Sequence, residues 1–282
     1  MKIVVTGAGG QLGQDLVRIM NEQHEVFGLT RNELDIKDLQ QTQSVIESIR
    51  PDAIVHAAAY TAVDLAEDEE TEAYQVNAFG SRNIALAAEQ VGAKICYIST
   101  DYVFDGQAAT PYREYDNTNP AGVYGKSKRA GEDLVKTLSS RYFIVRTSWV
   151  YGKHGNNFVK TMLKLAKEKD SLKVVHDQVG SPTYTVDLSY FIKELIETEK
   201  YGIYHASNTG TCSWFEFAKA IFEESSIKVN VQPCTTEEFP RPAPRPKYSV
   251  LDHLSIRANG FQDFRHWREA LKEFISKEME DQ

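Results

Sequence analysis

Cysteine is scarce in this chain of 282 residues, which has only Cys96, Cys212 and Cys234, without the spacing of metal ligands. Three scattered thiols do not form a disulfide framework or a zinc site. We expect them to be reduced, mostly buried side chains of an intracellular protein. A chain of this length can bury enough apolar surface to fold without cross-links, so disulfide scaffolds and zinc domains are excluded.

Long apolar runs and excess positive charge are also missing. No apolar segment approaches the roughly 20 residues that a membrane-spanning helix needs. The first residues lead directly into a strand pattern and lack the features of a signal peptide. The net charge of -8 gives no long-range attraction for nucleic acid or anionic lipid. We therefore expect a cytoplasmic protein that binds neither nucleic acid nor membranes.

Short β-branched segments alternate with helical ones in the first half of the chain. Strands are expected near residues 2–6, 25–28, 53–57, 94–99 and 142–146, and helices near 11–20, 38–49, 71–91 and 124–138. Such alternation is typical of right-handed βαβ units whose parallel sheet is covered on both faces. The predicted fold class is α/β, with a Rossmann-type doubly wound parallel sheet.

The pattern changes after about residue 150. Helices are expected near 157–169, 185–199, 213–223 and 263–279. We predict an NAD(P)-binding domain over 1–150 and a smaller, mostly helical C-terminal lobe over 151–282. Segments near 185–206 and 240–256 can return to the first domain. The proline-rich segment 239–246 can form neither a helix nor a central strand, and its composition alone is also consistent with a linker.

A glycine-rich loop lies between the first strand and the first helix. Gly7, Gly10 and Gly13 recur at intervals of three residues. Glycine is required where the chain turns tightly and a pyrophosphate must approach the N–H groups of a helix N-terminus. The loop therefore predicts a dinucleotide site, which includes Gln11 and Leu12 of the same turn.

The residues after the second strand bear on the choice of nicotinamide cofactor. An acidic residue there favours NAD by binding the adenosine ribose, but this chain has Thr30 and Arg31. An arginine can accommodate the 2′-phosphate of NADPH, so NADPH is favoured and NADH remains possible. The alternative is that Arg31 is an ordinary solvated charge.

Three polar residues form a candidate catalytic group. Tyr124 and Lys128 lie one turn apart on the same face of an expected helix, and Thr100 follows the fourth strand. A phenol has a pKa near 10, and a neighbouring ammonium group is expected to lower it. Tyr124 would exchange a proton with the substrate, Lys128 would adjust its pKa and bind the nicotinamide ribose, and Thr100 would orient a carbonyl oxygen.

Taken together, these motifs resemble the dTDP-4-dehydrorhamnose reductase family of the extended short-chain dehydrogenases. The resemblance spans nearly the whole chain and rests on segments 6–13, 99–106, 124–128, 146–152, 177–183 and 245–251. It implies reduction of the C4 keto group of dTDP-4-dehydrorhamnose to dTDP-L-rhamnose, the last step of dTDP-rhamnose biosynthesis. The implied cofactor is NADPH, or sometimes NADH.

The resemblance also implies individual binding residues. Around the cofactor it adds Asp35 and Ile36 beside the adenine, together with Ala58, Ala59, Tyr60, Thr61 and Asn77. Around the dTDP-sugar it implies Thr100, Asp101, Tyr124 and Lys128, with Trp149 against the sugar, and Asn156 or Asn157, Arg245 and Ser249 near the nucleotide. On this interpretation the proline-rich segment is a nucleotide clamp, since arginine suits a pyrophosphate.

Three other functions share parts of these motifs. The related 4,6-dehydratases have the sequence Thr-Asp-Glu where this chain has Thr100, Asp101 and Tyr102. With tyrosine in place of that glutamate, this chain would lack the general base of a dehydratase. A 4-epimerase of the same fold needs only the Tyr and the Lys, and would keep its nicotinamide tightly bound. A non-catalytic NADP-binding regulatory subunit would often lack part of the Tyr124–Lys128 pair.

One residue of the first expected helix, Asp15, bears on metal binding and dimerisation. Some members of the family dimerise through Mg²⁺ held by carboxylates, and Asp15 lies on the corresponding helix. A solvated carboxylate near the start of that helix is an equally good interpretation. We therefore assign no metal ligand, Mg²⁺ stays an open alternative, and a homodimer remains possible. Trp214 and Trp267 are expected in the core or on the surface of the lobe.

Overall fold

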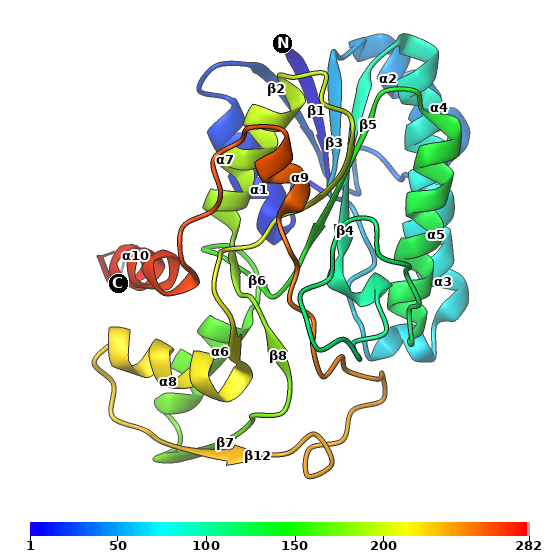
Figure 1. Ribbon diagram of the computed structural model, residues 1–282. Coiled ribbons are helices and arrows are strands. Elements are labelled where there is room, and N and C mark those ends of the chain that lie inside the picture. The colour runs from blue at the N-terminus through cyan, green and yellow to red at the C-terminus, as the bar shows by residue number, and fades with distance from the viewer. Residues whose placement is uncertain (281–282) are drawn as a thin grey trace.

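The computed structural model of this protein describes residues 1–280 and is built on one six-stranded parallel sheet (Figure 1). Its strands lie in the order β2-β1-β3-β4-β5-β10. Their bounds are β1 Lys2–Thr6, β2 Glu25–Leu29, β3 Ala53–His56, β4 Lys94–Thr100, β5 Tyr142–Thr147 and β10 Gly202–His205. The chain goes from β1 outward to β2 and then crosses back to β3, so the order reverses between β1 and β3. A dinucleotide binds at the carboxyl ends of strands at such a point.

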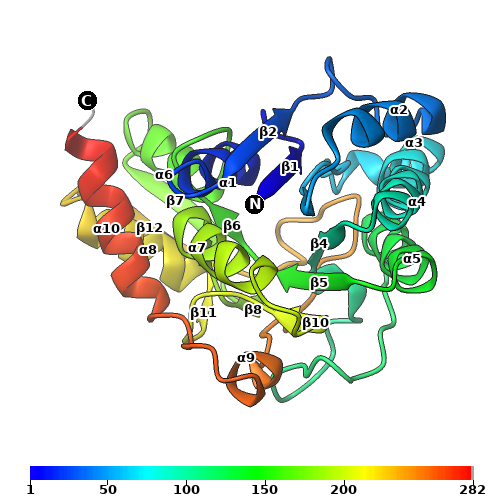
Figure 2. The same ribbon diagram turned by 90° about the horizontal axis from the view of Figure 1, so that it is seen from above.

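Helices cover both faces of this sheet, as Figure 2 shows from above. One face carries α1 (Gln11–Met20) and α7 (Thr185–Ile196), and the other carries α2 (Leu39–Ile49), α4 (Ser81–Val91) and α5 (Val123–Leu138). Asp38 caps the N-terminus of α2 by accepting a hydrogen bond from the Gln41 N–H. All four residues of β3 are buried, as expected for a parallel strand covered on both sides. The predicted fold class is confirmed.

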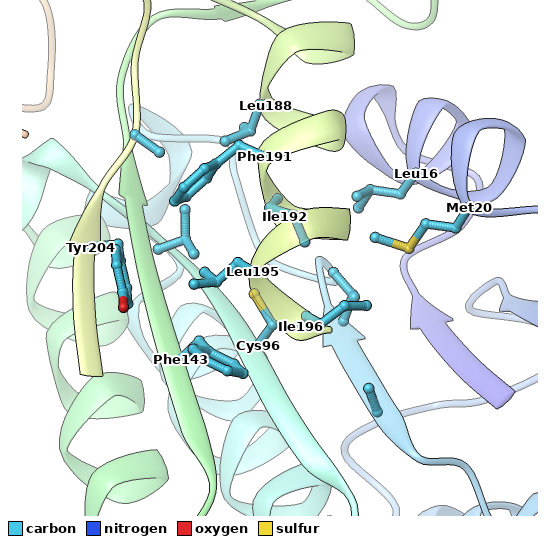
Figure 3. Close-up of a cluster of buried hydrophobic side chains, with 14 of the residues drawn as sticks. Leu16, Met20, Cys96, Phe143, Leu188, Phe191, Ile192, Leu195, Ile196 and Tyr204 are labelled. Carbon is cyan, nitrogen blue, oxygen red and sulfur yellow. The ribbon is translucent and has the colours of Figure 1, made fainter. Parts of the chain in front are cut away.

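The core between α1, α7 and the sheet is apolar and continuous (Figure 3). Helix α7 contributes Leu188, Phe191, Ile192, Leu195 and Ile196, which face Leu16 and Met20 of α1 and side chains of the central strands. Both α7 and β10 come from beyond residue 150, so the large sheet and its cover are completed by the second half of the chain.

The helix expected over 71–91 is interrupted by a wider turn. It consists of α3 (Glu70–Tyr74), the π-helical segment η2 (Gln75–Gly80) and α4. Such π-helical turns concentrate at functional sites because they redirect side chains. Asn77 lies in this segment and is fully buried. Two 3₁₀ turns, η1 (Leu65–Glu67) and η3 (Asp101–Val103), follow β3 and β4.

The second lobe lies below the carboxyl ends of the strands in Figure 1 and combines helices with small sheets. Its helices are α6 (Phe158–Ala166), α8 (Trp214–Glu224) and α10 (Trp267–Glu280), and the short α9 (Leu254–Ala258) packs on β10. Its two-stranded sheets pair β6 (Val150–Tyr151) with β9 (Thr183–Tyr184), β7 (Ser171–Val175) with β12 (Asn230–Cys234), and β8 (Val179–Gly180) with β11 (Cys212–Ser213). Helix α10 begins four residues later than expected.

The expectations for the cysteines and for membrane-spanning helices can be compared with the structure. Cys96, Cys212 and Cys234 are free, buried thiols. Along residues 1–280, no helix combines the length and apolar character needed to cross a membrane.

Candidate active site

The glycine-rich loop forms the predicted turn between β1 and α1. Gly7 has φ +70, a left-handed conformation, and its carbonyl accepts a hydrogen bond from the Gly10 N–H at 2.9 Å. A Cβ at Gly13 would lie 2.1 Å from the Gly7 carbonyl oxygen. No side chain caps the start of α1, so its first N–H groups remain available to an anion.

Replacing Gly13 with alanine therefore tests this loop. The added methyl group meets backbone rather than a movable side chain, so the loop must shift away from the start of α1. We expect the Kd for NADPH to rise about 100-fold, equivalent to about 3 kcal/mol. Titration of intrinsic fluorescence with NADPH measures this Kd. Gly92→Ala, at a helix C-terminus with open space around its Cβ, is a control that should keep the wild-type Kd.

A cleft of about 1030 Å³ runs from this loop along the carboxyl ends of the strands. Its size is at the upper end of the range for small-molecule sites, enough for a dinucleotide and a second ligand. Most of the residues predicted from sequence line it: Gly7, Gly10, Gln11, Leu12, Gly13, Thr30, Arg31, Asp35, Ile36, Ala58, Ala59, Tyr60, Thr61, Thr100, Asp101, Tyr124, Lys128 and Trp149. Asn77, Asn157, Arg245 and Ser249 are not among the lining residues.

Asn77 lies behind the cofactor side of the cleft. Its side chain accepts a hydrogen bond from the Tyr60 N–H at 2.9 Å and donates to the Tyr60 carbonyl at 3.1 Å. It also donates to the Ser127 hydroxyl at 3.0 Å. Asn77 therefore fixes the loop after β3 against α5, and acts on the cleft through that loop.

Asn157 has a structural role, and its neighbour Asn156 lines the cleft. The Asn157 side chain caps α6 by accepting a hydrogen bond from the Lys160 N–H at 3.0 Å. It also donates to the Gln11 side chain and the Gly152 carbonyl, both at 2.8 Å. Of the two asparagines considered, Asn156 is therefore the one in position to contact a ligand.

Arg245 joins the proline-rich segment to the loop after β3. Its guanidinium group pairs with the Asp64 carboxylate at 2.6 Å and lies 3.4 Å from the Tyr102 hydroxyl. Asp64 also accepts a hydrogen bond from the Ala243 N–H at 3.3 Å. The segment is thus attached at the rim of the cleft, beside the cleft residue Tyr102.

Tyr124 lies in the first turn of α5, where its side chain is partly buried and lines the cleft. The start of α5 is fixed by Glu67, which accepts a hydrogen bond from the Val123 N–H at 2.9 Å. Burial raises the pKa of the Tyr124 phenol well above its usual value, and the Thr100 hydroxyl acts in the opposite direction. Burial therefore has the largest effect on this pKa in the folded chain. The lowering expected from Lys128 and an oxidised nicotinamide stays a prediction.

Lys128 is almost completely buried one turn further along α5. Its ammonium group donates to the Ile98 carbonyl at 2.7 Å and lies 4.1 Å from the centre of the Tyr97 ring. Burial lowers the pKa of Lys128 to about 7, although the Glu132 carboxylate opposes the shift. Lys128 therefore titrates near neutral pH.

Thr100 and Asp101 meet Tyr124 from the end of β4. The Thr100 hydroxyl donates to the Asp101 carboxylate at 2.9 Å. Burial raises the pKa of Asp101 to about 6, with the hydroxyls of Thr100 and Ser249 acting to lower it. Ser249, four residues after Arg245, therefore lies near Asp101.

A buried ion pair beneath these groups was not foreseen from the sequence. Glu132 of α5 accepts two hydrogen bonds from Arg146 of β5, at 2.9 and 2.8 Å, and one from Ser99 of β4 at 2.6 Å. Arg146 also contacts the His205 ring of β10 at 3.3 Å. The network joins α5 to the strands β4, β5 and β10. Its only sequence signal is a Glu one turn beyond Lys128.

Asp15 does not face solvent, so its interpretation as a solvated carboxylate is wrong. It is 2% exposed and accepts hydrogen bonds from the Thr185 hydroxyl at 2.6 Å and from Arg18 at 2.9 Å. These bonds direct the carboxylate between α1 and α7. Within the described part of the chain, no group of three or more His, Cys, Asp or Glu side chains is arranged to hold a metal ion.

Comparison with known proteins agrees with this geometry. The profile of the family described as RmlD substrate binding domain matches residues 1–280. The spore coat polysaccharide biosynthesis protein SpsK of Bacillus subtilis is 48% identical over 277 residues, which cover 98% of this chain and 97% of that protein. The dTDP-4-dehydrorhamnose reductase of Aggregatibacter actinomycetemcomitans is 45% identical over 286 residues, covering 96% and 97% of the two chains.

A solved structure of a relative is also similar to this chain, both in sequence and in fold. The dTDP-4-dehydrorhamnose reductase of Bacillus anthracis, in complex with NADP, superposes with a TM-score of 0.97 at 52% identity, covering 98% of this chain and 99% of that one. The chain therefore belongs to the RmlD substrate binding domain family, the family of the dTDP-4-dehydrorhamnose reductases.

Proposed function

We propose that this protein reduces the C4 keto group of dTDP-4-dehydrorhamnose to dTDP-L-rhamnose with NADPH, the last step of dTDP-rhamnose biosynthesis. One observation carries the proposal: Thr100, Tyr124 and Lys128 line the same cleft as the glycine-rich loop. Relatives named for this reaction are similar over nearly their whole length. The protein acts in the cytoplasm, where reduced nicotinamide and nucleotide sugars are made.

The cofactor half of the cleft fits a dinucleotide. The loop before α1 has no side chain where a pyrophosphate must approach, and Asp35 and Ile36 line the adenosine end. Arg31 lies there too. It forms a long ion pair with Glu72 at 3.8 Å, and its side chain is 76% exposed, so the guanidinium group can turn toward a 2′-phosphate. Bound NADPH supplies the hydride that is added to C4 of the sugar.

Tyr124 is the proton donor in this mechanism. Because burial keeps the phenol protonated at neutral pH, it is in the form needed to protonate the oxygen that develops negative charge at C4. Thr100 lies beside it and orients the same oxygen with its hydroxyl group. Asp101, which lines the cleft next to Thr100, accepts hydrogen bonds from hydroxyl groups of the sugar.

Lys128 supports Tyr124 from the next turn of α5. Its ammonium group stabilises negative charge on the phenol after the proton has moved, and it binds the ribose next to the nicotinamide. With a pKa of about 7, Lys128 is partly charged at neutral pH.

The nucleotide half of the substrate lies toward the proline-rich segment. Arg245 and Ser249 come from the same segment, which reaches the cleft at Tyr102 and Asp101. Asn156 lines the cleft from the loop before α6 and is the third residue proposed for the nucleotide. Arg245 carries the cation suited to the substrate pyrophosphate, and its pairing with Asp64 holds it at the rim.

The test is oxidation of NADPH, followed by its absorbance, with dTDP-4-keto-6-deoxyglucose supplied first alone and then with a 3,5-epimerase. Oxidation that requires the epimerase is the expected result, because only the epimerised sugar has the rhamno configuration. A chain that oxidises no NADPH under either condition, and copurifies with nicotinamide, would instead be an epimerase. An inactive chain that copurifies without nicotinamide but binds added NADP would be the non-catalytic regulatory subunit.

A further inference from the structure

Two tryptophans from different segments stack at the rim of the cleft. Trp149 lies between β5 and β6 and lines the cleft, whereas Trp214 is the first residue of α8 and does not. Their ring centres are 3.5 Å apart and the ring planes are inclined by only 8°. Trp214 was expected in the core or on the lobe surface. It packs against the apolar core of the lobe, as expected, and is also in direct contact with a residue of the cleft.

Trp149 adopts a backbone conformation that tryptophan rarely occupies. Its φ is +49, in the left-handed region, so surrounding contacts must hold it there. Its carbonyl accepts a hydrogen bond from the Thr183 N–H at 3.2 Å. A Cβ at Gly180 would lie 2.6 Å from the indole ring, so only glycine leaves room for the ring in this position.

Trp214 is itself held firmly in place. Ser213 and Glu216 form a capping box in which the Glu216 N–H donates to the Ser213 hydroxyl at 3.1 Å and the Ser213 N–H donates to the Glu216 carboxylate at 2.7 Å. The Phe158 ring of α6 packs on Trp214 with ring centres 4.5 Å apart. The helix start and the neighbouring ring thus fix the indole on which Trp149 rests.

We propose that Trp214 is a positioning residue that fixes the Trp149 indole at the sugar end of the cleft and so controls binding of the nucleotide sugar. This inference rests on the proposed function, in which Trp149 packs against the sugar. Without the stack, Trp149 has no ring to rest on and can leave its left-handed conformation. Most of the contacts proposed for NADPH lie at the glycine-rich loop and the adenosine end of the cleft and involve neither tryptophan ring.

Steady-state kinetics of Trp214→Ala test this role. We expect the KM for the nucleotide sugar to rise about tenfold, equivalent to about 1.4 kcal/mol, with kcat and the KM for NADPH within about twofold of wild type. Trp214→Phe retains a flat ring and should restore most of the affinity. Trp267→Phe, a buried tryptophan of the same lobe, is the matched control and should keep the wild-type KM for both ligands.

A double-mutant cycle separates positioning from a general effect on the lobe. If Trp214 acts through Trp149, then Trp149→Ala and Trp149→Ala/Trp214→Ala should have the same KM for the sugar nucleotide. The inference would be overturned if the double variant raised KM by the combined effect of the two single substitutions, or if Trp267→Phe raised KM as much as Trp214→Ala. Either result would leave the proposed function intact. A wild-type chain that does not turn over the sugar would overturn both.

Discussion

Tyr124→Phe is expected to reduce kcat about 1,000-fold while leaving the Kd for NADPH nearly unchanged, because proton donation is lost and little else changes. Phenylalanine fills the same buried space in the first turn of α5, and the glycine-rich loop does not depend on the phenol. Rapid-quench or steady-state assays give kcat, and fluorescence titration with NADPH gives the Kd.

Tyr142→Phe is the control for this experiment. It removes a phenol hydroxyl at the start of β5, away from the residues that line the cleft, and should keep the wild-type kcat. If Tyr124→Phe and Tyr142→Phe both turned over at the wild-type rate, Tyr124 would not be the proton donor.

Lys128→Met is expected to lower kcat/KM about 100-fold and, at the same time, to stabilise the folded protein. The folded-state pKa of Lys128 lies at about 7, below the ordinary value of 10.5. Between these two values the unfolded chain binds more protons than the folded chain, so wild-type stability rises with pH. Methionine removes the buried charge and with it this contribution to the pH dependence.

The expected gain in unfolding free energy is about 2 kcal/mol near pH 6, after allowing for the lost hydrogen bond to Ile98. It should shrink as the pH rises toward about 10, where Lys128 is neutral in both states of the wild-type chain. Urea unfolding of both proteins across this range measures the effect. A variant less stable than wild type at low pH, or with the same pH dependence, would show that burial does not hold the pKa of Lys128 down.

The sequence predicted the candidate site best where residues that act together are also close together in the chain. Gly7, Gly10 and Gly13 lie in a single turn, and Tyr124 and Lys128 lie one helical turn apart. In such cases spacing alone places the groups together, because a strand–loop–helix unit and a helix have known geometry. The fold class was predictable for the same reason, since the alternation of strands and helices is a local pattern.

Contacts between distant segments could not be predicted in this way. Asp64 and Arg245 are 181 residues apart, and Asp15 and Thr185 are 170 apart. Nothing near Asp15 indicates that a threonine of α7 will bury its carboxylate. Resemblance narrowed one choice to Asn156 or Asn157 but could not decide between them, because the decision depends on which one caps α6.

The pKa of Tyr124 illustrates a different limit. The sequence placed a cation one turn away, which lowers the pKa of a phenol, but it could not reveal how deeply both groups are buried. In the folded chain burial has the larger effect on each of them. Competing effects of opposite sign can be compared only when the surroundings of both groups are known.

The central claim is that hydride from NADPH is added to C4 of a nucleotide-linked sugar. The most direct measurement uses NADPH deuterated at the transferable position, with NMR of the sugar product formed from dTDP-4-dehydrorhamnose. The expected product is dTDP-L-rhamnose with deuterium at C4 and nowhere else on the ring. Deuterium at another carbon, or dTDP-L-rhamnose formed without deuterium from the supplied NADPH, would contradict the claim.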